Sequence, residues 1–200
     1  MLYYGLSLNV SALSGNLYLN NAINGFVELL SYVVCILLLE RIGRSYMTGG
    51  FMIIGGVSCI GAMLLNLFAG GTLWMLEFAK WLSFGGKFAI SGSFNVIFIF
   101  ASELYPTEIR SNGVGFTSGI GRIGGILAPF ITLLQNNEAF EFVPLSIFGI
   151  LGICSGIWTL FLPETTGRPI LQHIEEAEIF YSSHGSKQRK INQTADLSSF

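Results

Sequence analysis

Three ionisable residues stand inside long apolar stretches of this 200-residue sequence: Glu28, Lys87 and Arg122. A charge at the centre of a bilayer costs about 2.5–3.5 kcal/mol or more, so such residues face a cavity or pair with one another, and they often mark the path of a substrate or an ion. The chemistry that these residues could do is therefore the binding of a small charged ligand.

Two interpretations of the three charges stay open. In the functional interpretation, the charges bind a charged ligand. In the structural interpretation, Glu28 pairs with Lys87 or with Arg122 only to hold the helices together. One cation is then left over in either case. That surplus favours an anionic ligand group, or a partner helix that this sequence does not contain.

Aromatic residues accumulate near the three charges. Their rings could stack on a ligand or hold a quaternary ammonium by cation–π attraction, although an aromatic residue in a span more often packs in the core or faces lipid. The residues concerned are Tyr3, Tyr4, Tyr32, Phe84, Phe88 and Phe94.

The elements that position these residues are membrane helices. The chain is 52% hydrophobic and 11% charged, whereas soluble domains carry about 25% charged residues. Crossing a bilayer takes about 20 mostly apolar residues. We therefore predict an all-α membrane fold, with a six-helix bundle over residues 1–165 and a tail over 166–200 that begins with a short helix and is otherwise disordered. The six predicted spans are 1–18, 22–39, 47–68, 79–102, 112–134 and 144–162, and polar residues make the first of them marginal.

Positive charges orient the spans. Arg41 and Arg44 follow the second span, Arg110 follows the fourth, and four more Lys and Arg residues lie in the tail. The connections on the other side, about 16–21, 69–73 and 135–143, contain none. By the positive-inside rule the first group of connections and the C-terminus are cytoplasmic.

The three buried charges lie at similar depth. At a rise of 1.5 Å per residue, Arg122, Glu28 and Lys87 lie about 15, 18 and 22 Å from the cytoplasmic ends of their spans. Glycines four residues apart, such as Gly115 with Gly119 and Gly152 with Gly156, let membrane helices approach closely.

Other function classes find no support in the sequence. A net charge of -2 gives no reason to expect a nucleic-acid partner. The three cysteines have neither disulfide nor zinc spacing. Both histidines, His173 and His184, lie in the tail, and there is no nucleotide-binding loop or nucleophile motif. We predict no enzyme activity, no metal and no cofactor.

Five short stretches resemble a known family. The motifs are YYGLSLN at 3–9, LSGNLYLN at 13–20, ERIGRS at 40–45, ASELYPTEIR at 101–110 and LPETTGR at 162–168. In this order they resemble the organic cation, anion and carnitine-type zwitterion transporters of the major facilitator superfamily. The resemblance implies a twelve-helix fold of which this chain supplies helices seven to twelve, with the N-terminal six-helix half missing. It also implies alternating access around a midplane site, in the plasma membrane.

The resemblance also separates the branches of the family. Arg122 stands where the cation transporters carry an acid, and Lys87 and Phe94 match the anion transporters, but Tyr32 stands where those carry a lysine. The carnitine-type transporters resemble the chain better, with GKF at 86–88, Glu28, Tyr32 and Arg122. The implied substrate-binding residues are Arg122, Lys87, Glu28, Tyr4, Tyr32 and Phe94. A zwitterion would set its carboxylate on Arg122 and its ammonium near Tyr4 and Phe94.

Charges at the cytoplasmic ends form a second group. The resemblance implies that they are a gate whose salt bridges stabilise the outward-facing state; anchoring at the membrane interface is the alternative. The gate residues are Arg41, Arg44, Glu103, Arg110 and Glu164.

We therefore expect the transport of small organic ions, carboxylate-bearing zwitterions or organic anions above all, by a protein of which this chain is a fragment. The alternative is a truncated, non-transporting membrane protein that binds full-length partners or interferes with them.

Overall fold

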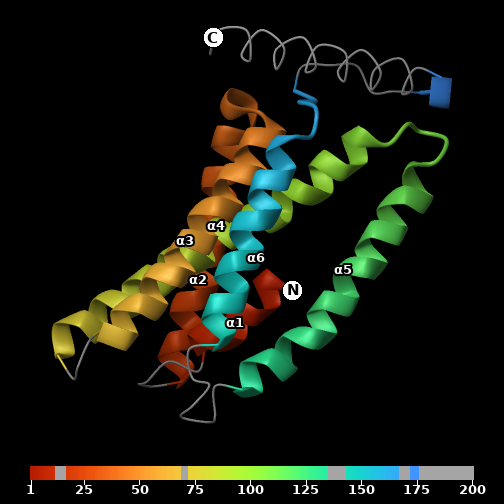
Figure 1. The fold of residues 1–200 in the computed structure, drawn as a ribbon. Coiled ribbons are helices and arrows are strands. Elements are labelled where there is room, and N and C mark those ends of the chain that lie inside the picture. Colours follow the sequence, from red (N-terminus) through yellow and green to blue (C-terminus); the bar gives the residue numbers. More distant parts are fainter. Residues whose placement is uncertain (12–16, 69–71, 135–142, 167–171, 176–200) are drawn as a thin grey trace, which may run out of the picture.

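The computed structural model describes residues 1–11, 17–68, 72–134, 143–166 and 172–175. All of its regular elements in these ranges are helical, which confirms the predicted all-α class (Figure 1). The helices are α1 (Leu2–Ser11), α2 (Leu17–Ile42), α3 (Arg44–Phe68), α4 (Leu73–Leu104), α5 (Arg110–Leu133) and α6 (Val143–Leu160).

Five helices, α2 to α6, are long and apolar enough to cross a membrane. Helix α1 has ten residues and rises about 15 Å, half of the hydrocarbon thickness. The predicted span 1–18 is wrong at its end, because residues 17 and 18 already belong to α2; residues 12–16 lie outside the described part. Helix α4 begins six residues earlier than predicted. The predicted tail is described only at residues 166 and 172–175.

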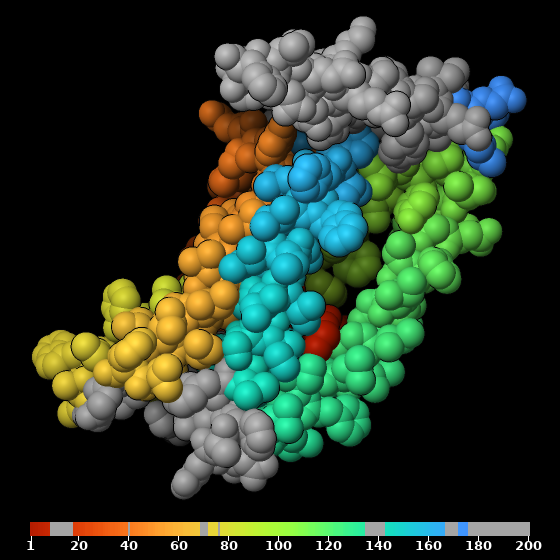
Figure 2. All heavy atoms as spheres, in the orientation of Figure 1, coloured from red at the N-terminus to blue at the C-terminus, as the bar shows by residue number. Residues whose placement is uncertain are grey.

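Helix α3 packs most extensively against α4 and α6, beside which it lies in Figure 1. Helix α5 stands to one side and packs mainly on α1. Only Ala128 of α5 is buried. Figure 2 shows a hollow between α6 and α5, in which atoms of α1 are visible.

Glycines allow α3 and α6 to touch through their backbones. A Cβ built on Gly156 would lie 2.8 Å from the carbonyl oxygen of Gly49, and one on Gly56 would lie 2.7 Å from that of Gly149. Such contact replaces the hydrophobic driving force that is missing between helices in lipid. By contrast, a Cβ on Gly119 of α5 meets nothing within 4 Å among the described residues. Close packing therefore applies to α6 and not to this part of α5.

Helix α1 fills the middle of the bundle. Its Leu6 is fully buried in one cluster with Cys59 of α3, Ile90 of α4 and Leu145 of α6. The ring of Phe148 lies directly on Gly5, where a Cβ would come within 2.2 Å of it. A short helix is thus held by three longer ones.

We predict that Gly156→Ala destabilises the protein, whereas Gly119→Ala does not. Overpacking costs about 1–3 kcal/mol, and the gain in helix propensity of about 1 kcal/mol offsets only part of it at Gly156. Thermal unfolding in detergent, followed by size-exclusion chromatography, measures the difference. Equal midpoints for the two variants would contradict the close contact between α3 and α6.

Candidate functional site

Helices α1, α2 and α4 meet at a polar cluster inside the bundle. Lys87 Nζ of α4 lies 3.8 Å from Glu28 Oε2 of α2, and the lysine side chain is 0% exposed. Of the two pairings that the sequence left open, the structure has Glu28 with Lys87. Arg122 is the cation left over.

Two tyrosines and a serine complete this cluster. The hydroxyls of Tyr3 and Tyr32 both donate hydrogen bonds to Glu28 Oε1. Lys87 Nζ donates to Ser7 Oγ and lies 3.8 Å from the centroid of the Tyr3 ring. Each charge of the pair is therefore satisfied by neutral groups as well as by its partner.

A row of rings adjoins the cluster. Tyr3 stacks on Phe94 with 4.4 Å between centroids and 12° between planes. The edges of Tyr4 and Phe98 meet Phe94 at 6.2 and 5.2 Å. Tyr4 and Phe98 are 44% and 43% exposed. These two rings are exposed, whereas Phe94 and Tyr3 are half-buried. Tyr3 has Phe94 on one face of its ring and Lys87 Nζ on the other.

Arg122 stays apart from the other predicted residues. Its side chain is exposed, and it forms no ion pair within the described ranges. It is linked to the cluster through the backbone of α5: the ring of Tyr4 packs on Gly125, where a Cβ would lie 3.2 Å from the ring. Gly125 is three residues, about one turn, from Arg122.

Five of the six predicted binding residues thus gather around α1. The sixth, Arg122, lies on α5, the helix that packs mainly on α1. Neither Ser7 nor Phe98 was predicted to belong to the site, and Tyr3 was named only as a ring near the charges. The one local signal is that Tyr3 and Ser7 are four residues apart and so share a helix face.

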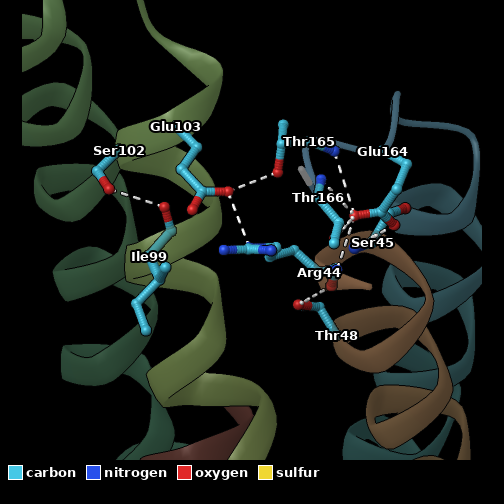
Figure 3. A network of polar contacts seen from close by, with 9 residues as sticks. All are labelled: Arg44, Ser45, Thr48, Ile99, Ser102, Glu103, Glu164, Thr165 and Thr166. Atoms are coloured by element: carbon cyan, nitrogen blue, oxygen red, sulfur yellow. Dashed lines mark hydrogen bonds and ion pairs between the residues drawn. The ribbon is translucent and has the colours of Figure 1, made fainter. Parts of the chain in front are cut away.

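A second polar network joins the ends of α3, α4 and α6 (Figure 3). Arg44 Nε forms an ion pair with Glu103 Oε2 at 3.0 Å. Thr165 Oγ1 donates to the same oxygen at 2.6 Å. The segment that follows α6 is thereby fixed to the end of α4.

Glu164 caps the start of α3. Its carboxylate accepts from the backbone N–H groups of Arg44 and Ser45 at 2.8 and 3.1 Å. An acid at this position satisfies N–H groups that have no partner in the helix and matches the helix dipole. Gly43 permits the approach: its φ is +93°, and a Cβ there would lie 2.7 Å from Glu164 Oε2.

Three of the five predicted gate residues, Arg44, Glu103 and Glu164, therefore belong to this network. The structure does not bring the other two into it. Arg41 is exposed. Arg110 instead donates to the carbonyl of Tyr105 at 3.4 Å and to Thr107 Oγ1 at 3.2 Å.

The chain is similar in sequence to known transporters. Residues 1–177 match the family described as "Sugar (and other) transporter". The chain belongs to this transporter family, within the major facilitator superfamily. It is accordingly a multi-pass integral membrane protein and a transporter-family chain rather than an enzyme.

Individual relatives confirm the resemblance to organic ion transporters. The chain is 40% identical over 181 residues to solute carrier family 22 member 15-like of Xenopus laevis. The aligned residues make up 89% of this chain and 36% of that protein. It is 42% identical over 180 residues to organic cation transporter 1 of Caenorhabditis elegans, covering 90% and 29%. For solute carrier family 22 member 3 of Mus musculus the identity is 34% over 202 residues, covering 98% and 35%. The transporter-family chain thus spans about a third of the length of these relatives.

We predict that Glu164→Gln destabilises the protein in a pH-dependent way. Burial by itself raises the pKa of the Glu164 carboxyl, but hydrogen bonds from Thr166, Arg44 and Ser45 outweigh it and hold the pKa below its ordinary 4.5. Since the pKa is lower in the folded chain, the stabilisation is complete above pH 4.5 and is lost as the pH falls through the folded-state value. The cost at pH 7 is about 1 kcal/mol, the size of a lost helix cap.

The measurement is the unfolding midpoint of the protein and the variant from pH 7 down to about pH 3, which extends well below the ordinary carboxyl pKa of 4.5. Glu175→Gln, at an exposed position, is the control and should follow the unsubstituted protein throughout. A Glu164→Gln deficit that stays constant across this range would show that the carboxylate charge has no part in the cap.

Proposed function

We propose that this chain is the C-terminal half of a transporter that moves small organic ions by alternating access. The observation that carries the proposal is a difference among the three charged residues within the spans: Glu28 and Lys87 neutralise each other at 3.8 Å, whereas Arg122 is exposed. An exposed, unbalanced cation within a membrane span is costly unless a ligand or a partner supplies the opposite charge.

The substrates are carboxylate-bearing zwitterions of the carnitine type, or organic anions. Arg122 is the group for the carboxylate, because a guanidinium binds a carboxylate through two parallel hydrogen bonds. Tyr4 and Phe94 supply rings for a quaternary ammonium. Glu28, Tyr32 and Lys87 form the polar cluster behind this wall. Support comes from the exposure of Tyr4 and from its contact with Gly125 near Arg122.

The opposite wall of the site comes from an N-terminal six-helix unit. The protein lies in the plasma membrane with its C-terminus in the cytoplasm. Support for this orientation comes from Arg41, Arg44 and Arg110, which all lie at the ends of helices that the positive-inside rule assigns to the cytoplasm. The network of Arg44, Glu103 and Glu164 then belongs to the inner gate, with Arg41 and Arg110 on the same side.

A non-transporting role is the second candidate. It is favoured by the open positions of Gly115, Gly119 and Gly121, which meet nothing within 4 Å among the described residues. A helix from another membrane protein could pack there. The coding sequence upstream of residue 1 and the size of the protein in membranes separate the two candidates.

We predict that Arg122→Asp in the full-length transporter abolishes the uptake of carnitine-like zwitterions and organic anions. Reversal of the charge turns attraction of the carboxylate into repulsion, and a loss of at least about tenfold is expected because bonds between charged groups are worth about 1.5–3 kcal/mol. Uptake of labelled substrate by cells measures the effect, with surface expression as a check. Lys80→Met is the matched control, since Lys80 pairs with Glu77 in an exposed position. Unchanged carboxylate uptake in Arg122→Asp would rule out this site.

A further inference from the structure

We propose that Lys87 is a positioning residue: it seats α1 against α2 and α4, and through α1 it holds the helix that carries Arg122. Only the consequence for transport rests on the proposed function. The seating of α1 is a property of the bundle and can be tested without transport.

The first step concerns the surroundings of Lys87. The side chain is fully buried, and its ammonium group faces Glu28 Oε2, Ser7 Oγ and the ring of Tyr3. Ser7 and Tyr3 belong to α1, Glu28 to α2 and Lys87 to α4. An ammonium has three donor hydrogens, and three groups of the protein are already placed to receive them.

The second step concerns Tyr3, the residue of α1 that contacts both Glu28 and Lys87. Its hydroxyl donates to Glu28. One face of its ring stacks on Phe94, so Lys87 Nζ, which lies 3.8 Å from the ring centroid, covers the other face. Removal of the lysine would expose a ring face and leave the Glu28 carboxylate without its cation.

The third step connects α1 with Arg122. Helix α5 packs mainly on α1, through Met1 on Gly124 and Tyr4 on Gly125. The two glycines are two and three residues from Arg122. A shift of α1 would therefore move Tyr4 and the part of α5 that bears the arginine, although Lys87 itself touches neither.

A native cysteine reports whether α1 is in place. Cys59 of α3 is 1% exposed. It belongs to the same buried cluster as Leu6 of α1, and Leu2 and Tyr3 pack against this cluster. In a Cys35→Ala/Cys154→Ala background it is the sole thiol, because the chain has three cysteines. Its rate of reaction with a maleimide in mild detergent then measures how often α1 leaves its seat.

We expect Lys87→Met to raise the Cys59 labelling rate about tenfold or more, because loss of one partner of a buried ion pair leaves the other uncompensated. The double variant Glu28→Gln/Lys87→Met should return the rate to within about threefold of the background, since no orphan charge remains. Arg122→Met and Lys80→Met should leave it unchanged. Two results would overturn the proposal: labelling of Cys59 at the background rate in Lys87→Met, or labelling of the double variant as fast as that of Lys87→Met. The double variant also decides the case in which the single variant fails to fold.

Uptake supplies the second readout. If Lys87 only positions α1, the double variant recovers carboxylate uptake that Lys87→Met loses, whereas Arg122→Met stays inactive with Cys59 protected. If Lys87 binds the substrate carboxylate itself, the double variant stays inactive and the positioning role is refuted. Absence of uptake by the unsubstituted full-length transporter would refute the proposed function alone, because the labelling of Cys59 in this chain would still decide the role of Lys87.

Discussion

Lys87 is buried completely where α1, α2 and α4 meet, and the protein has to balance its charge at that point. Breaking such a pair costs far more than forming it gains, because an isolated ion inside a protein has lost its water without compensation. Glu28 supplies the opposite charge, and the hydroxyls of Tyr3 and Tyr32 hold that carboxylate. The position of α1 follows from this requirement, because two of the groups that satisfy the pair are carried by this ten-residue helix.

The rest of the bundle divides into a closely packed part and a loosely attached helix. Helices α3 and α6 approach until the backbone of one meets the glycines of the other, and α4 packs on α3 over a long stretch. Helix α5 lacks such contacts and leans mainly on α1, with the hollow of Figure 2 between it and α6. The pair of Glu28 and Lys87 is thus connected to α5 mainly through α1.

The polar network of Arg44, Glu103 and Glu164 connects the ends of the closely packed helices α3, α4 and α6. Glu164 caps α3, and Glu103 receives both Arg44 and Thr165, so that the ends of α3, α4 and α6 are tied together. None of these bonds reaches α5. The ends of α3, α4 and α6 are therefore fixed to one another, whereas α5 is held mainly by α1.

Composition and the lengths of the apolar segments were enough to predict the class of fold, the approximate spans of the long helices and an excess of positive charge within those spans. Those features depend on composition and on the 1.5 Å rise of a helix, which a single segment reveals. Counting residues along the spans also predicted a similar depth for Glu28, Lys87 and Arg122. It could not decide which cation Glu28 would take, because a depth says nothing about the direction in which a helix faces.

The packing of the helices pairs Lys87 with Glu28 and leaves Arg122 exposed. The same holds for Ser7 and Tyr3, whose roles arise from α1 lying across α2 and α4, and for Thr165, which contacts Glu103 across 62 positions of sequence. It likewise left Arg41 and Arg110 outside the network that their location suggested. Such contacts join residues that are distant in sequence, and they are set by the packing of whole helices, which no local pattern specifies.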